Sequence, residues 1–157
     1  MKIKLLAVGK TDDKNLESLF ETYRKRLVHY VSFEVEIIPD IKKAKSLSVT
    51  EQKRLEGEAI LKKVQVGDQV LLLDERGKEF RSVEFARFLQ KKMNAGTRNL
   101  ILVIGGPYGF SEPVYQRANG KLSLSKMTFS HQMIRVFLAE QLYRAFTILR
   151  NEPYHHE

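Results

Sequence analysis

Two short segments of the sequence are apolar at every position, and they constrain the fold more than any other feature. Residues 70–73 and 100–104 each have the length of a buried strand, and polar residues or glycine bound them. A strand with apolar side chains on both sides must be covered on both faces, as in a parallel sheet between two layers of helices. These segments therefore predict an α/β fold with a mostly parallel sheet and helices on both faces.

Strand and helix signals alternate through the rest of the chain, without repeats or a linker-like stretch. Short or alternating apolar runs predict further strands at residues 2–8, 33–38 and 122–125. Capping side chains that precede apolar residues at helical spacing predict helices that begin at Asp12 or Asp13, Ser48, Ser82, Ser111 and Ser130. We expect Gly96 and Gly120 to end the third and fourth helices, and the last helix to extend to about residue 150. The chain is expected to be a single domain.

The composition excludes several classes of protein. Without cysteine, the chain has no disulfide framework, no zinc ribbon and no thiol nucleophile. The four histidines lack the spacing of metal ligands, so we expect no metal. Residues 100–104 are the longest apolar run, far short of the roughly 20 residues needed to cross a bilayer, and the opening residues alternate too strictly for a signal peptide. We expect a cytoplasmic protein without a membrane partner.

The charge balance points to an anionic partner. The chain carries 27 Lys and Arg residues against 19 Asp and Glu residues, a net charge of +8. Long-range attraction and counterion release then favour RNA, DNA or a ribonucleoprotein. The charged residues of the most one-sided stretch are Arg117, Lys121, Lys126, Arg135, Arg144 and Arg150, with Glu140 alone opposing them. The alternative is a basic surface that serves only solubility.

Ligands of open α/β sheets bind beyond the carboxyl ends of the strands. Three segments of this kind follow apolar strands: Leu73 with Asp74, residues 104–109, and residues 124–129. The glycine-rich loop after residue 104 has neither the glycine spacing of a dinucleotide-binding loop nor the Gly-Lys-Ser/Thr of an NTP-binding loop. Its glycines allow a ligand to approach the backbone closely. The alternative is a tight connection from strand to helix.

The last predicted helix is apolar around most of its circumference. One sheet cannot cover that much apolar surface. Such a helix is either central to a large core or buried against a partner, and a domain of this size favours the second, so we infer a homodimer. His131 with Arg135, and Glu140 with Arg144, are four residues apart and share a side of the helix within each pair. They form ordinary helix pairs or, at a buried interface, charges that must find partners.

The sequence leaves this helix at Pro153 and ends with an aromatic residue and two imidazoles. One interpretation of this segment is a frayed terminus. In the other, Tyr154 stacks on a base while His155 exchanges a proton near neutral pH.

Several segments together resemble a known family. They are residues 2–10 (KIKLLAVGK), 103–107 (VIGGP), 122–132 (LSLSKMTFSHQ), 140–145 (EQLYRA) and 153–155 (PYH), together with Arg135 and Val136. As a set that spans the chain, they are similar to the small SPOUT-class ribosomal RNA methyltransferases of the RlmH type. Ser130 departs from the proline that many relatives carry before the histidine, but a serine still caps a helix.

The resemblance implies a single SPOUT methyltransferase domain over residues 1–157, in which residues 100–150 form a trefoil knot and the dimer helix. Topology rules alone argue against a knot, because knots are rare. The resemblance also implies a homodimer that uses S-adenosyl-L-methionine as the methyl donor, without a metal. The implied acceptor is N3 of a pseudouridine in a hairpin loop of 23S ribosomal RNA on the assembled ribosome, with neither DNA nor a membrane as partner.

Carried over by position, the resemblance implies that the methyl donor contacts Leu73, Gly105, Leu124, Ser125, Lys126, Met127, Thr128 and Phe129. These residues lie at the strand ends that the α/β pattern indicates. Our hypothesis for the reaction assigns stabilisation of the uracil oxygens to Arg144 or Arg135. His155 takes the N3 proton directly or through water, and Tyr154 stacks on the extruded base.

The RNA-facing groove is expected to contain Lys121, Arg117 and the tails of both subunits. We expect His131 to support the donor loop and the interface. Two rival functions remain open at this point. One is a related knotted methyltransferase that acts on transfer RNA, and the other is a noncatalytic RNA-binding or assembly factor that kept the fold and lost methyl transfer.

Overall fold

In the computed structural model, which describes residues 1–42 and 44–156, five strands form one sheet in the order β2-β1-β4-β3-β5. The strands are β1 (Lys2–Val8), β2 (Ser32–Ile38), β3 (Gln69–Glu79), β4 (Asn99–Ile104) and β5 (Gly120–Ser123). Every neighbouring pair is parallel. The two fully apolar segments lie in β3 and β4, each of which has a strand on both sides. The predicted parallel sheet is confirmed.

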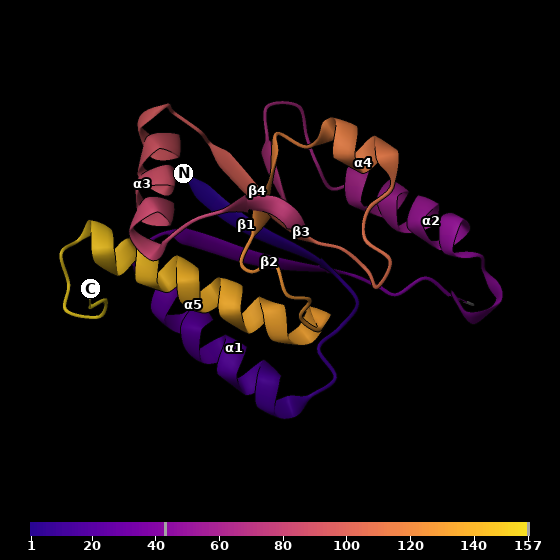
Figure 1. Cartoon of the computed structure of the whole chain (residues 1–157), viewed down its shortest axis with the longest axis horizontal. Helices are drawn as coiled ribbons and strands as arrows, with labels where there is room; N and C mark the ends of the chain where they lie inside the picture. The colour runs from indigo at the N-terminus through magenta and orange to yellow at the C-terminus, as the bar shows by residue number, and fades with distance from the viewer. Residues whose placement is uncertain (43, 157) are drawn as a thin grey trace.

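Helices cover both faces of the sheet (Figure 1). One layer contains α1 (Lys14–Leu27), α3 (Ser82–Asn94) and α5 (His131–Leu149), and the other contains α2 (Val49–Leu61) and α4 (Glu112–Arg117). A short 3₁₀ helix, Ala44–Ser46, precedes α2. Among the described residues, no helix is long and apolar enough to cross a membrane. The layers agree with the predicted α/β class.

The side chains of β1 show how the sheet divides the core. Ile3 and Leu5 pack in the cluster under α1, α3 and α5, whereas Leu6 and Val8 pack in the cluster under α2 and α4. This alternation follows from the two-residue period of a strand. All four side chains expose 5% of their surface or less, and burial of each contributes about 1.5–3 kcal/mol to folding.

Capping side chains fix several helix boundaries as predicted. Asp13, not Asp12, caps α1 by accepting hydrogen bonds from the backbone of Asn15 and Leu16. Ser48 and Ser130 cap α2 and α5 in the same way. These bonds satisfy backbone N–H groups that have no partner inside the helix.

Three predicted boundaries are wrong. Ser82 is the first residue of α3 rather than its cap, because the Glu84 carboxylate accepts a hydrogen bond from the Arg81 N–H and places Arg81 at the cap. The fourth helix ends at Arg117, and Gly120 opens β5 instead of ending that helix. The last strand is therefore Gly120–Ser123, and residues 124 and 125 already belong to the loop after it.

The sequence did not indicate the second half of β3. Leu73 and Lys78 both pair with Leu122 of β5, so residues 74–77 leave the ladder between them. Gly77 lies against the β5 backbone, where a Cβ atom would come within 2.7 Å of Leu122 N and Lys121 C. This bulge carries Asp74 and Glu75 to the edge of the sheet where β3, β4 and β5 end.

Candidate functional site

A cavity of about 510 Å³ lies at the carboxyl ends of β3, β4 and β5, as expected for an open α/β sheet. Its lining includes seven of the eight predicted donor contacts: Leu73, Gly105, Leu124, Ser125, Met127, Thr128 and Phe129. Lys126 lies in the same loop but is exposed and outside the lining. The fold thus brings together three chain segments that the sequence separates by up to 56 positions. We refer to this space as the donor cavity.

Asp74 gives the donor cavity an acidic wall. Its carboxylate accepts hydrogen bonds from the Tyr115 hydroxyl (2.6 Å) and the Arg76 backbone N–H (2.8 Å). Burial alone raises the pKa of Asp74, but these bonds and the charges of Lys121 and Arg76 hold it below its ordinary value. Burial and the neighbouring Asp74 raise the pKa of Tyr115 to about 12. Asp74 is therefore ionised near neutral pH. Its place directly after an apolar strand was the only sequence signal for it.

Hydrogen bonds fasten the loop after β5 over the donor cavity. The Ser125 hydroxyl accepts a hydrogen bond from Met127 N (3.0 Å), while the Ser123 hydroxyl donates to Ser125 O (2.8 Å). The Thr128 hydroxyl reaches across to the Glu75 carboxylate (3.0 Å). Sequence analysis missed Glu75, because the contact joins residues 53 positions apart. The bond ties the loop after β5 to the bulge of β3.

The loop after β4 is packed too closely for side chains at its first two positions. A Cβ atom on Gly105 would lie 2.9 Å from the Phe110 ring, and one on Gly106 would lie 2.3 Å from the Glu56 carboxylate. The ring of His131, at the start of α5, donates a hydrogen bond to the Gly105 carbonyl. Burial and the charge of Arg135 lower the pKa of His131, and Glu56 and the bond to Gly105 oppose them. This contact connects α5 to the loop after β4, and the predicted role of His131 at the donor loop and the interface stays a prediction.

Arg135 is 3% exposed and lies outside the lining of the donor cavity. Its guanidinium donates to the carbonyls of Val8 and Gly9 and to the Thr11 hydroxyl, at 2.7–3.1 Å. Burial lowers its pKa, and the carboxylates of Asp40 and Asp12 oppose that effect. Arg135 thus ties α5 to the end of β1. Its predicted catalytic role stays a prediction.

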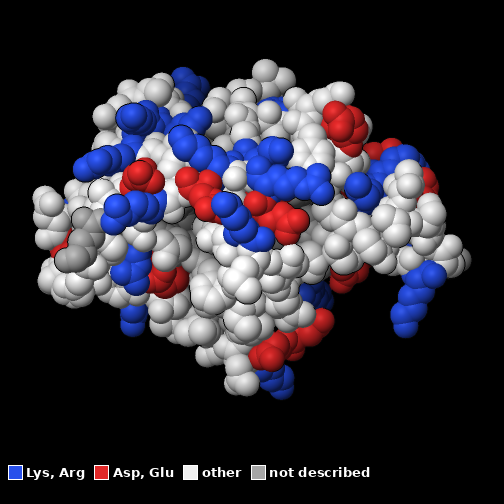
Figure 2. Space-filling view, viewed as in Figure 1, with Lys and Arg blue, Asp and Glu red and all other residues white. Residues whose placement is uncertain are grey.

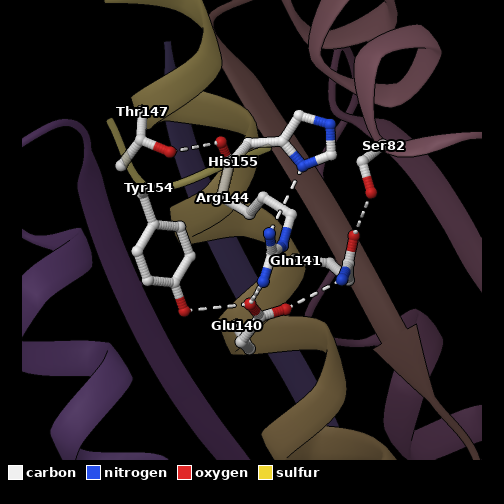
Figure 3. A network of polar contacts seen from close by, with 7 residues as sticks. All are labelled: Ser82, Glu140, Gln141, Arg144, Thr147, Tyr154 and His155. Atoms are coloured by element: carbon white, nitrogen blue, oxygen red, sulfur yellow. Dashed lines mark hydrogen bonds and ion pairs between the residues drawn. The ribbon is translucent and has the colours of Figure 1, made fainter. Parts of the chain in front are cut away.

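The carboxyl-terminal tail folds back on α5 through a polar network (Figure 3). The Glu140 carboxylate receives hydrogen bonds from the Arg144 guanidinium and from the Tyr154 hydroxyl (3.0 Å). The same guanidinium lies 4.7 Å from the centre of the Tyr154 ring. Burial, Glu140 and Tyr23 raise the pKa of Tyr154 above its ordinary value. The structure therefore brings together Arg144, Tyr154 and His155, and the tail is not frayed here.

The contact between Arg144 and His155 constrains the imidazole. Arg144 Nη1 lies 3.3 Å from His155 Nδ1. A guanidinium has only donors, so a hydrogen bond between these atoms runs from Arg144 to His155 Nδ1. In this arrangement the lone pair of His155 Nδ1 is occupied by Arg144.

The tail network and the donor cavity lie at opposite ends of α5. His131 lines the cavity, and Arg144 follows it by 13 positions, which is about 20 Å along a helix. A second cavity of about 320 Å³ lies between the two ends, and its lining includes Phe80, Phe129, Phe137 and Gln141. Met133 and Phe137 of α5 are 40% and 44% exposed beside it. These two apolar side chains of α5 are therefore only partly covered by the described residues, Phe137 by the Phe129 ring at 5.2 Å between ring centres.

The two residues expected in an RNA-facing groove differ in whether their side chains are held by hydrogen bonds. Lys121 is exposed, with Nζ 5.7 Å from the centre of the Tyr115 ring. Arg117 donates to the carbonyls of Gln65 and Asp68, at 2.9 and 3.1 Å. Arg117 thus supports the turn before β3 in this structure. Within residues 1–42 and 44–156, no group of three His, Asp or Glu side chains has the arrangement of a metal site.

The fold and this site define a class of protein. A structure of a probable methylase family protein from Haemophilus influenzae Rd KW20 superposes with a TM-score of 0.51 at 15% identity, over 95% of this chain and 66% of that one, which supports the fold. The model of the family described as "Predicted SPOUT methyltransferase" matches residues 1–155. The chain belongs to the SPOUT methyltransferase family.

Within this family, the sequence is similar to several proteins named "Ribosomal RNA large subunit methyltransferase H". The protein from Flavobacterium johnsoniae is 62% identical over 157 residues, all of both chains. The one from Christiangramia forsetii is 64% identical over 156 residues, 99% of each chain. The one from Parabacteroides distasonis is 58% identical over the full length of both. The resemblance drawn from the sequence segments is confirmed.

Proposed function

We propose that the protein transfers a methyl group from S-adenosyl-L-methionine to N3 of a pseudouridine in a hairpin loop of 23S ribosomal RNA on the assembled ribosome. The observation that carries the proposal is the donor cavity, which seven of the eight expected donor contacts line at three strand ends. Full-length relatives named as ribosomal RNA large subunit methyltransferases support the substrate class. An assembled ribosome as substrate implies a cytoplasmic protein.

The residues of the donor cavity fit a methyl donor of this kind. A volume of about 510 Å³ suits a ligand of a few tens of atoms. Leu73, Leu122 and Leu124 offer an apolar surface for a planar base, and the ionised Asp74 offers a countercharge. When bound, the donor supplies a methyl group on a positively charged sulfur. The cavity residues bind and orient it, so that the methyl carbon lies in line with the acceptor nitrogen.

The tail network supplies the groups that the acceptor needs. The N3–H of a uracil ring is a weak acid, and its nitrogen becomes nucleophilic as the proton leaves. Arg144 stabilises the negative charge that develops on the uracil oxygens, and Tyr154 offers a ring for stacking. His155 takes the proton, which requires that its Nδ1 first part from Arg144.

A homodimer completes the site. Within one chain, about 20 Å of helix separates the donor cavity from Arg144, too far for direct transfer. The exposed Met133 and Phe137 of α5 offer a second copy an apolar surface beside the cavities. A partner docked there brings its own tail to the donor cavity of the first chain. This arrangement keeps residues 1–157 as one domain, with residues 100–150 as the knot and the dimer helix.

The distribution of basic side chains favours one face for the RNA. Lys and Arg gather over α3 and the strand ends beside it, with acidic side chains between them (Figure 2). The exposed basic residues of these elements are Arg76, Lys78, Arg81, Arg87 and Lys91. None of the five forms a salt bridge within the described chain, whereas Arg24, Arg54 and Lys63 pair with glutamates elsewhere. Unpaired cations beside the donor cavity favour contact with phosphates.

Transfer of labelled methyl from S-adenosyl-L-methionine tests the function. Unmodified 70S ribosomes, separated subunits and bulk transfer RNA are offered in parallel, and the labelled nucleotide is mapped. We expect label only with assembled ribosomes, at N3 of a pseudouridine of 23S RNA. Label in transfer RNA would overturn the substrate. Tight ribosome binding without label would favour a noncatalytic factor.

A further inference from the structure

Glu56 of α2 is a buried acid to which the proposed reaction gives no task. It is 3% exposed. Its Oε1 accepts a hydrogen bond from the Gln52 side chain (3.0 Å), whereas its Oε2 has no hydrogen-bond partner among the described residues. A buried carboxylate oxygen without a partner is costly to stability. A group of this kind therefore calls for a structural or functional explanation.

Glu56 lies against the backbone of the loop after β4, at Gly106. A Cβ atom on Gly106 would come within 2.3 and 2.5 Å of its two oxygens, so the carboxylate lies directly against the Gly106 backbone. Gly106 and its neighbour Gly105 both line the donor cavity. The carboxylate therefore forms the support beneath this part of the cavity wall.

Close packing beside Glu56 holds α2 against the start of α4. The next residue, Gly57, lies so close to α4 that a Cβ atom would be 2.2 Å from the Ser111 hydroxyl. On the cavity side, the charge of Glu56 acts on His131, whose ring donates to the Gly105 carbonyl. Arg135 is the opposing charge at His131, and it adds to the effect of burial in lowering the His131 pKa. Glu56 thus supports Gly106 by contact and influences Gly105 through His131.

We propose that Glu56 is a positioning residue for the methyl donor, whose buried carboxylate holds the backbone at Gly105 and Gly106 and the His131 ring in the arrangement that binds the donor. This inference rests on the proposed function, because it names a determinant of the same site. It assigns the residue to donor affinity and not to the chemical step, since Glu56 lies outside the lining of the cavity.

Glu56→Gln is the test, because it keeps the shape of the side chain and an acceptor for Gln52 while removing the charge. We measure the Kd of S-adenosyl-L-methionine by calorimetry, the rate of single-turnover methylation at saturating donor, the thermal midpoint and the His131 titration by NMR. We expect donor binding to weaken about tenfold or more, with a transfer rate at saturation within about threefold of wild type. The His131 pKa should fall, because a negative charge near the imidazole is lost.

The thermal midpoint separates positioning from a merely structural role. Removing an unpartnered buried charge should leave the midpoint unchanged or raise it, whereas loss of a structural contact lowers it. Glu58→Gln is the matched control on the same helix, since Glu58 is 53% exposed and paired with Arg54. This variant should bind the donor like wild type. Gly106→Ala disturbs the contact between Glu56 and the loop from the loop side, and it should also weaken donor binding.

Three results would count against the proposal, and they have different meanings. If wild type binds the donor and Glu56→Gln binds it equally well with an unchanged His131 titration, the positioning role is overturned and the proposed function stands. If wild type itself does not bind S-adenosyl-L-methionine, the proposed function fails and the positioning role fails with it. Weaker binding by Glu56→Gln together with a lowered thermal midpoint also overturns the proposal, in favour of a structural role.

Discussion

The two ends of α5 differ in how they offer groups for chemistry. At the amino-terminal end, His131 and Ile134 border a cavity whose other walls combine the backbone of the glycine-rich loop and aliphatic side chains with charged residues such as Asp74 and Arg76. At the carboxyl-terminal end, Glu140 and Arg144 hold Tyr154 in a network of charged and aromatic groups bonded to one another. The first end is open to a ligand, whereas the second is occupied by the chain's own tail. The difference indicates that donor binding and acceptor chemistry are separable within one chain.

Arg144→Ala is expected to give the largest effect and to sharpen this separation. It removes the cation paired with Glu140 and stacked on Tyr154, so we expect methyl transfer to fall by roughly 100-fold or more. Donor affinity should stay unchanged, because Arg144 is proposed to act on the acceptor and is not part of the lining of the donor cavity. Single-turnover rates and calorimetric donor binding measure the two quantities. Arg24→Ala, which breaks the Arg24–Glu21 pair on the surface of α1, is the control and should alter neither. A parallel loss of donor affinity would show that the ends are coupled.

A mixing experiment asks whether the two ends meet across a dimer. Ser125→Trp fills the donor cavity and Arg144→Ala disables the tail, so each variant alone is expected to be inactive. If each site combines the cavity of one subunit with the tail of the other, half of the randomly mixed dimers carry one intact site. Activity should then return to about one quarter of wild type. No recovery, with mixed dimers verified by mass spectrometry, would place both ends in the same subunit.

Gly77→Ala is expected to act on the cavity end alone. A Cβ atom there meets the backbone of Leu122 at 2.7 Å, so β3 or β5 must shift. We expect about tenfold weaker donor binding and a loss of about 1–3 kcal/mol of stability, as for an overpacked site. Urea unfolding and calorimetry measure both. Gly120→Ala in the same strand pair meets only the tip of the Leu71 side chain, at 3.1 Å, and should cost less. Equal effects of the two substitutions would contradict the role of the backbone contact.

Sequence patterns predicted the strands at the cavity because an apolar segment reveals its own burial. They did not reveal the second half of β3, whose residues 74–79 are polar and become a strand only by pairing Lys78 with Leu122. The buried state of Arg135 was also beyond local patterns. A charged residue in an apolar helix indicates that the charge has a partner. The partners of Arg135, the carbonyls of Val8 and Gly9, lie more than 120 positions away in the sequence. Contacts of this range depend on the completed fold.

Tyr30→Phe should give the smallest effect and tests how firmly the tail end is fixed. The Tyr30 hydroxyl donates to the Glu152 carboxylate (2.5 Å), and this bond, with burial, raises the pKa of Tyr30 to about 12. A raised pKa means that folding favours the protonated phenol. The bond therefore stabilises the fold below about pH 10, and the contribution is lost as the pH rises from about 10 to 12.

We expect Tyr30→Phe to lower the free energy of unfolding by about 1 kcal/mol at pH 8, with the difference from wild type shrinking above pH 10. Urea unfolding at a series of pH values measures it, and donor affinity should not change. Tyr108→Phe is the control for loss of a tyrosine hydroxyl, because Tyr108 is 49% exposed. A difference that persists undiminished at pH 11.5 would mean that Tyr30 contributes through packing against Tyr143 and Arg150 rather than through its bond to the tail. The tail would then be held at the carboxyl-terminal end of α5 by the contacts of Arg144 and Tyr154 alone.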